Sequence, residues 1–184
     1  MRVRAAVMAA TTILGAIALA TAPAVGAAEN PYATTQATVQ YTVYQPMQTL
    51  GLAMNPGTGG FQTTACSTPG GPMINAAYGS QQSGKSGIGI GESQKGCLDG
   101  PDGVGRYGTV AIGSATATIM GQCPGQRATC PKASVGGVRH QAYTTVTLPA
   151  AHGHTSTLIE LYTNGIGPRD IARILRGLAP VAAS

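Results

Sequence analysis

The segment Gly79–Ser86 has the most distinct chemical signature in the chain, because it fits the pattern G-x-x-x-x-G-K-S of a phosphate-binding loop. In such a loop, backbone N–H groups at the start of a helix surround the phosphates, and the lysine, here Lys85, contacts them. The residues that follow, Gly87–Gly91, have glycine at alternate positions, and glycine disfavours a helix. We therefore interpret Gly79–Ser86 as a polar hairpin loop and expect no bound nucleotide.

Two other groups of polar side chains could bind a metal ion. The segment Asp99–Gly103, together with Glu92, resembles half of a calcium loop, but calcium requires about six to eight oxygen ligands. His152 and His154, together with His140, could bind a transition metal. The residues around Asp99–Gly103 are typical of a turn, and the histidines lack the spacing of helical ligands. We expect turns at both places, without a metal ion or another cofactor.

A hydrolytic site is a further hypothesis. Acid–base catalysis needs titratable side chains that meet in one pocket, and the chain offers such side chains at Glu92, Asp99, Asp102 and His140. The sequence contains no G-x-S-x-G motif around a serine nucleophile. Clustering of the four residues in one pocket would favour a secreted hydrolase. Dispersal over the molecule would favour a binding protein without enzymatic activity.

The cysteines indicate an oxidising compartment. An even number in an exported chain predicts disulfides, and this chain has four cysteines, Cys66, Cys97, Cys123 and Cys130. Three pairings are possible, and we favour Cys66–Cys97 with Cys123–Cys130 because neighbours in sequence close short loops. A four-cysteine zinc site is the alternative, but the spacings are too wide for the paired C-x-x-C ligands of such sites.

The N-terminus predicts export. A basic start, MRVR, precedes a charge-free stretch, residues 5–28, that ends in small side chains, as a secretory signal does. Cleavage could follow Ala27 or Ala28, and we favour Ala28, so that residues 1–28 form the signal peptide. An uncleaved membrane anchor is the alternative, because the stretch is long enough to span a bilayer. Its Ala and Thr content and Pro23 favour cleavage.

The composition disfavours nucleic acid as a partner. Lys and Arg number 11 and Asp and Glu six, and removal of residues 1–28 lowers the basic excess from five to three. A nucleic-acid groove needs clustered basic residues with stacking aromatic rings. Here the basic residues are scattered from Lys85 to Arg176, with no Trp and one Phe. We predict a flexible mature N-terminus at residues 29–35 and one globular domain at residues 36–184.

Alternating apolar and polar residues predict strands. Val39, Tyr41 and Val43 alternate with polar side chains, which indicates a half-buried strand at Gln36–Tyr44. The glycine-rich segment Gly96–Gly108 is expected to be a loop. Further strands are expected at Phe61–Cys66, Met73–Tyr78, Gly87–Glu92, Tyr107–Ile112, Ala115–Met120, Gln141–Leu148 and Thr157–Thr163.

One helix is expected near the C-terminus, from Pro168 to Pro180, which prevents further extension. Apolar side chains at helical spacing form one stripe: Ile171, Ile174, Leu175 and Leu178. Basic side chains lie off that stripe: Arg169, Arg173 and Arg176. We favour a helix docked on a sheet. A cationic membrane-active helix is the alternative, and it requires the apolar stripe to be exposed.

The order of segments resembles small exported proteins of actinobacterial type. More distantly, it is similar to an extracytoplasmic domain of unknown function in Gram-positive membrane and anti-sigma proteins. The resemblance is one of spacing, and it is carried by Tyr44–Pro46, Leu50–Leu52, Gly87–Ile90, Val110–Met120, Leu158–Thr163 and Gly165–Leu178. The cysteine pairs and the glycine-rich centre depart from that domain. The resemblance implies no functional residues.

Together these observations predict an α+β fold: a single domain with a twisted, mostly antiparallel sheet, a C-terminal amphipathic helix on one face and two disulfides. We expect an exported, non-enzymatic protein that binds or senses a protein or cell-envelope component outside the cytoplasm. A secreted hydrolase and a cationic membrane-active protein remain the alternatives.

Overall fold

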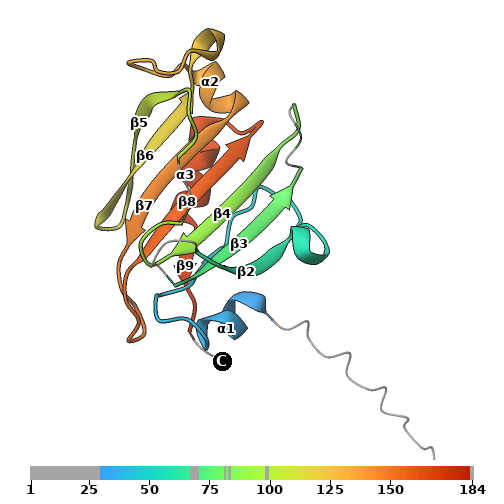
Figure 1. Cartoon of the computed structure of the whole chain (residues 1–184), viewed down its shortest axis with the longest axis vertical. Coiled ribbons are helices and arrows are strands. Elements are labelled where there is room, and N and C mark those ends of the chain that lie inside the picture. The colour runs from blue at the N-terminus through green and yellow to red at the C-terminus, as the bar shows by residue number, and fades with distance from the viewer. Residues whose placement is uncertain (1–29, 67–70, 81, 83, 98–99, 183–184) are drawn as a thin grey trace, which may run out of the picture.

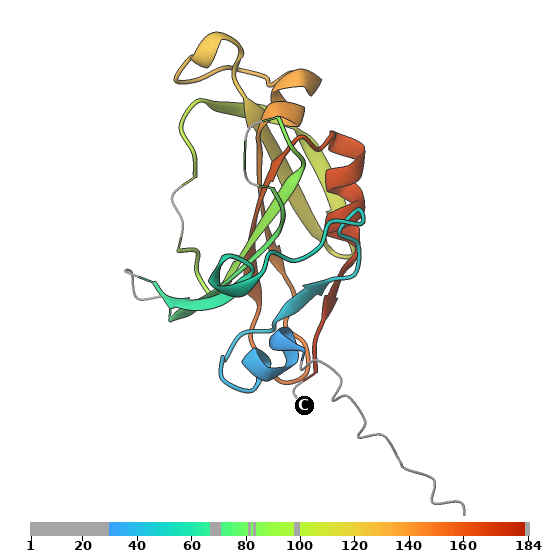
Figure 2. The ribbon, with the colours of Figure 1, turned by 90° about the vertical axis from the view of Figure 1, so that its right-hand side faces the viewer.

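The computed structural model of the chain describes residues 30–66, 71–80, 82, 84–97 and 100–182. Figures 1 and 2 show their arrangement in two perpendicular views. The predicted signal peptide, residues 1–28, lies outside the described residues and stays a prediction.

Strands form most of the regular secondary structure in the described residues. They are β1 (Tyr44–Pro46), β2 (Phe61–Ala65), β3 (Pro72–Gly79), β4 (Gly87–Ser93), β5 (Val104–Ile112), β6 (Ala115–Gln122), β7 (Ala142–Leu148), β8 (Thr157–Asn164) and β9 (Leu178–Pro180). The helices are short: α1 (Pro31–Gln36), η1 (Gly57–Gly59), η2 (Pro124–Gln126), α2 (Val135–His140) and α3 (Pro168–Arg176).

Seven strands form one antiparallel sheet in the order β2-β3-β4-β8-β7-β6-β5, and β1 pairs with β9 in a separate antiparallel ribbon. The prediction of a mostly antiparallel sheet with few helices is therefore confirmed. Figure 2 shows the twisted sheet nearly edge-on, with α3 on one side and the segment that follows β4 on the other.

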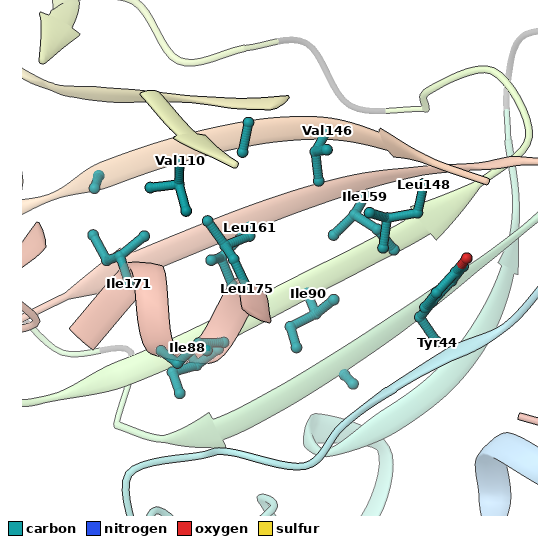
Figure 3. Close-up of a cluster of buried hydrophobic side chains, with 14 of the residues drawn as sticks. Tyr44, Ile88, Ile90, Val110, Val146, Leu148, Ile159, Leu161, Ile171 and Leu175 are labelled. Atoms are coloured by element: carbon teal, nitrogen blue, oxygen red, sulfur yellow. The ribbon is translucent and has the colours of Figure 1, made fainter. Parts of the chain in front are cut away.

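Alternation along the central strands separates the two faces of the sheet. In β8, Ile159 and Leu161 are almost fully buried, and they share the hydrophobic core with Ile88 and Ile90 of β4 (Figure 3). The residue between them, Glu160, points to the opposite face, because successive side chains of a strand alternate. The core face is thus continuous across neighbouring strands.

The apolar stripe of α3, which we define as Ile171, Ile174 and Leu175, is fully buried in the same core. Pro168 occupies an N-terminal position of this helix, as predicted, and Gly167 is its N-cap. Gly177 ends the helix, so Leu178 belongs to β9 rather than to the helical stripe. Pro180 closes that strand.

Most of the segment that we expected to be flexible, residues 29–35, lies in the helix α1. Asn30 caps α1 by accepting the backbone N–H of Tyr32 at 3.1 Å. The ring of Tyr32 is 1% exposed, its hydroxyl lies 2.6 Å from that of Tyr78, and it packs edge-on against Phe61 at 4.8 Å. Tertiary contacts of one aromatic ring therefore order a segment without apolar periodicity.

The predicted strand at Gln36–Tyr44 is also wrong in form, although its apolar side chains are buried. Gln36 lies in α1, and its buried side chain bonds the backbone further along the chain. Its Nε2 donates to the carbonyl of Tyr41 at 3.0 Å, and its Oε1 accepts the N–H of Val43 at 2.6 Å. A side chain thus satisfies backbone groups that a neighbouring strand would otherwise pair.

Two further elements differ from the expectation. The strand β5 begins at Val104, inside the segment expected to be a loop. The helix α2 was not predicted, because Gly136 and Gly137 lower its helix propensity. Ser134 caps it by accepting the N–H of Gly137 at 3.0 Å. A Cβ at Gly137 would overlap the carbonyl of Gln122, so this glycine allows α2 to lie against β6.

Both favoured disulfide pairings are confirmed. Cys66 pairs with Cys97, with their Cα atoms 5.4 Å apart, and Cys123 pairs with Cys130, with their Cα atoms 5.7 Å apart. Among the described residues no free cysteine remains. These bonds fit an oxidising compartment outside the cytoplasm.

Candidate functional site

The phosphate-loop match is a hairpin connection, as predicted. β3 ends at Gly79 and β4 begins at Gly87, and these two glycines are partners in the antiparallel register. A strand therefore follows the motif where a phosphate-binding loop would need the start of a helix. A Cβ at Gly87 would overlap the carbonyl of Ser80, so this glycine serves the tight turn.

The residues of the hydrolase hypothesis do not share a pocket where the structure describes them. Asp99 lies outside the described residues. Glu92 is fully buried and pairs with Ile159 of β8. His140 is exposed and lies two residues before Ala142. Ala142 pairs with Thr163 of β8, which is four residues beyond Ile159. These two positions on β8 are therefore roughly 13 Å apart. Asp102 is exposed in the connection before β5.

The candidate metal ligands are equally dispersed. His140 precedes β7, whereas His152 and His154 follow it, so the seven residues of β7 separate them by roughly 23 Å. Among the described residues no group of three His, Cys, Asp or Glu side chains could hold a metal ion. On the calcium hypothesis, only Glu92 and Asp102 can be placed, one buried and one exposed.

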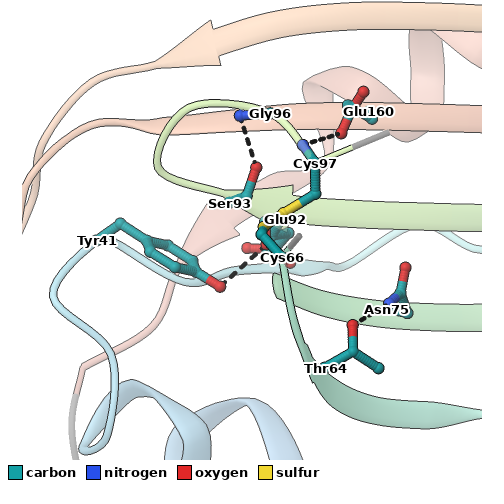
Figure 4. Close-up of a disulfide and its surroundings, with 9 residues drawn as sticks. All are labelled: Tyr41, Thr64, Cys66, Asn75, Glu92, Ser93, Gly96, Cys97 and Glu160. Carbon is teal, nitrogen blue, oxygen red and sulfur yellow. Dashed lines mark hydrogen bonds between the residues drawn. A yellow bond between two sulfur atoms is a disulfide. The ribbon is translucent and has the colours of Figure 1, made fainter. Parts of the chain in front are cut away.

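Glu92 is the least expected group in the core. Its Oε2 accepts the backbone N–H of Tyr44 at 2.8 Å, while its Oε1 has no hydrogen-bond partner among the described residues. Tyr41 donates its hydroxyl to the backbone carbonyl of Glu92 at 3.0 Å (Figure 4). Burial raises the pKa of the Glu92 carboxyl to about 8, and the bond from Tyr44 partly opposes that rise. Glu92 is therefore a buried, mainly neutral carboxyl that joins β4 to the N-terminal segment.

A second buried carboxylate, Glu160, lies on the opposite face of the sheet. Its Oε1 accepts the hydroxyl of Tyr143 at 2.8 Å. Its Oε2 accepts the N–H of Cys97 at 3.4 Å (Figure 4). The disulfide to Cys66 thus holds the segment after β4 over Glu160. With Glu92 and Glu160 both buried, the described residues offer carboxylates to solvent only at Asp102, which is exposed, and at Asp170, whose side chain is 44% exposed.

The exposed face of α3 is strongly basic. Arg169, Arg173 and Arg176 are all exposed. Because a helix turns by about 100° per residue, the three lie within about 60° of one another and opposite the apolar stripe. Arg173 contacts Asp170 at 3.5 Å, but the two side chains are 63% and 44% exposed, and such exposed pairs contribute little. We call these three side chains the arginine row.

A hollow of about 770 Å³ lies beside the arginine row. All three arginines line it, together with Met47, Gln48 and residues 177–179. Gly177 shapes this side, because its added Cβ would lie 2.8 Å from the Gln48 side chain. Its carbonyl accepts the N–H of Met47 at 2.8 Å. The Met47 side chain, 64% exposed, therefore stands next to the arginine row in a groove that is basic and partly apolar.

Sequence reasoning placed the three arginines off the apolar stripe and gave them a role only in the alternative of a cationic membrane-active helix. Their spacing of four and three residues already predicts a shared helix face. The sequence could not show that the described surface has few carboxylates. Nothing in it distinguishes Glu92 and Glu160, which are buried, from Asp102 and Asp170. It also could not predict that Met47 lies beside the arginine row, more than a hundred positions along the chain.

Comparison with known proteins gives no functional assignment. No protein-family model, curated protein or solved structure matches the chain. Among the described residues, none of the helices combines the length and the apolar character needed to cross a bilayer.

Proposed function

We propose that the protein is an exported, non-enzymatic binding domain of the extracellular space or cell envelope, and that the arginine row of α3 binds an anionic component there. The observation that carries the proposal is the exposed row of Arg169, Arg173 and Arg176 beside a hollow of about 770 Å³. Arginine is suited to this role, because its planar guanidinium donates paired hydrogen bonds to carboxylate and phosphate groups.

Helix stability does not explain the whole row. Arg173 and Arg176 lie in the last turn of α3, where the helix dipole favours positive charge. Arg169 lies in the first turn, two residues after the N-cap Gly167, where the dipole disfavours a positive charge by about 0.3–1 kcal/mol. A bound anion that neutralises the arginine row would offset this cost, which explains a cation at position 169.

The location outside the cytoplasm has separate support. The disulfides Cys66–Cys97 and Cys123–Cys130 persist in oxidising compartments, and the sequence of residues 1–28 has the pattern of a secretory signal. Secretion itself is part of the proposal.

In this proposal, α3 is a cover docked on one face of the sheet and presents its arginines outward. Burial of the apolar stripe in the common core supports that role. The same burial weighs against the membrane-active alternative, which needs the stripe to enter the lipid. The large apolar side chains that the described surface exposes are Met47 and Val135.

The proposal is tested by sedimentation of the purified protein with an insoluble cell-envelope fraction. The test variant is Arg169→Gln/Arg173→Gln/Arg176→Gln. The matched control removes three exposed charges from loops, Lys95→Gln/Arg127→Gln/Lys132→Gln. Both variants lose three positive charges, at different positions on the described surface.

We expect the wild-type protein and the loop control to sediment with the envelope, and the α3 variant to stay in solution. Binding should weaken with salt, because exposed charges are screened. Equal retention of the two variants, or equal loss, would show that the row is not the binding surface. Circular dichroism of both variants checks that the fold is intact.

A further inference from the structure

A second hollow, of about 350 Å³, lies on the other flank of the arginine row, between α3 and the edge strand β5. We call it the Tyr107 hollow. Its wall on α3 is formed by Arg169, Ala172 and Arg176, and its floor and far wall by residues 107–110 and Ile119. Pro168 closes one end. This volume lies at the lower end of the range for small-molecule sites.

A β-bulge places the aromatic ring of this hollow. The register between β5 and β6 runs from Arg106 paired with Met120 to Gly108 paired with Ile119, so Tyr107 is the extra, unpaired residue. A bulge re-aims the side chain at that position. Ile119 belongs to the core face, and Tyr107 lines the hollow on the same side, half-buried.

The floor of the hollow is open next to that ring. A Cβ built at Gly108 would meet no heavy atom of the described chain within 4 Å. Its backbone φ lies outside the left-handed region, so neither packing nor backbone geometry requires glycine here. Glycine in a strand often marks a bulge, such as the one between Arg106 and Gly108, or the close approach of a ligand, for which the open floor leaves room.

We propose that the Tyr107 hollow binds an anionic oligosaccharide, with a sugar ring stacked on Tyr107 and its carboxylate groups held by Arg169 and Arg176. Arg176 lies seven positions after Arg169, about 10 Å along the helix axis, so a chain of several rings that carries more than one anionic group can reach both side chains. The Tyr107 ring and Ala172 fit the carbon face of a sugar. This inference rests on the proposed function and names its ligand class.

Other ligands fit this hollow less well. A peptide added as a strand would need the free edge of β5, and the bulge at Tyr107 interrupts that edge. A lipid surface would need exposed apolar side chains, and Met47 and Val135 do not line this hollow. A single-stranded nucleic acid would need several stacking rings, whereas Tyr107 is the aromatic residue here.

The test is a calorimetric titration with tetragalacturonate, which carries a carboxylate on every ring. Maltotetraose, of the same length and uncharged, is the control for the sugar rings, and polyaspartate is the control for charge alone. We expect tetragalacturonate to bind the wild-type protein at least about tenfold more tightly than either control. We expect Arg169→Gln/Arg176→Gln to abolish that binding.

Two matched pairs of variants separate the ring from the charge. Tyr107→Phe keeps the ring and should bind like wild type, whereas Tyr107→Leu keeps apolar volume and should bind about tenfold more weakly. Gly108→Val fills the floor and should also lose binding. Ala111→Val, in the same strand but outside the hollow, should leave binding unchanged.

Equal affinities of Tyr107→Leu and Tyr107→Phe would overturn the inference. Equal binding of polyaspartate and tetragalacturonate would overturn it too. So would tighter binding of phosphatidylglycerol vesicles or oligothymidylate. If the arginine variant still failed to bind the envelope fraction in those cases, the proposed function would survive without this ligand. The titrations and the envelope sedimentation together therefore distinguish failure of this inference from failure of the proposed function.

Discussion

Replacement of the buried Glu92 by glutamine should change how the stability of the protein depends on pH. The carboxyl is fully buried, and burial raises its pKa to about 8 from an ordinary value of 4.5. Between these two values the folded protein holds a proton that the unfolded chain releases. The contribution of Glu92 to stability is therefore fully present below about pH 4.5 and is lost as the pH rises to about 8.

The magnitude follows from the size of that pKa change. Each pH unit within the window lowers the free energy of unfolding by about 1.4 kcal/mol, so the whole window amounts to about 5 kcal/mol. In Glu92→Gln the amide oxygen can still accept the N–H of Tyr44, but the amide group does not titrate. Its NH₂ would occupy the place of the unpartnered Oε1, at a pH-independent cost of about 1–3 kcal/mol.

The assay is urea unfolding of wild type and Glu92→Gln at several pH values from 4 to 9. Because the two proteins have every other titrating group in common, the difference between their stabilities reports on Glu92. We expect the variant to be the less stable protein near the acid end and the more stable one near pH 8, so that the two curves cross. Parallel curves, separated by a constant free energy, would refute the reasoning. They would mean that Glu92 binds its proton equally in the folded and unfolded states.

Two further predictions concern the core and its covalent links. The pair Cys66→Ala/Cys97→Ala opens a loop with a sequence separation of 31 and should lower the free energy of unfolding by about 4 kcal/mol. The pair Cys123→Ala/Cys130→Ala, with a separation of 7, should lower it by about 2 kcal/mol. Denaturant unfolding under non-reducing conditions measures both losses, and the opposite order would contradict the loop argument. Ile174→Ala, in the buried stripe of α3, should destabilise the protein by about 2–5 kcal/mol in the same assay, whereas a loss below about 0.5 kcal/mol would mean that α3 does not support the core.

Much of the sheet could be predicted from local patterns. Alternation and turn residues indicate most strands, including Tyr107–Ile112 and Ala115–Met120, which correspond to β5 and β6. The cysteine pairs could be predicted from their spacing, because short loops close at low entropy cost. These features depend on residues close together in the chain.

The rest depends on contacts between distant residues. The segment around Tyr41 has the alternation of a strand, but Gln36 satisfies its backbone instead of a neighbouring strand. The order of α1 depends on Tyr32, which bonds Tyr78 far along the chain. A short helix with two glycines, α2, has no propensity signal. Its fit against β6 becomes visible only when the sheet is assembled.

The candidate site was missed for the same reason. The arginine row could be found from helical spacing, but its hollows require β5 and Met47 to lie beside α3. Tyr107 looked like an ordinary strand residue, since a bulge depends on how two strands pair rather than on one strand's sequence.

The central claim is that the arginine row of α3 is the binding surface, and chemical footprinting of arginines tests it most directly. The protein is treated with a dicarbonyl reagent with and without the envelope fraction, and modification of each arginine is measured by mass spectrometry. Arg127, exposed on a loop, is the internal reference. We expect the envelope fraction to suppress modification of Arg169, Arg173 and Arg176 and to leave Arg127 unchanged. Equal modification of the row in both samples, or protection of Arg127 alone, would contradict the account.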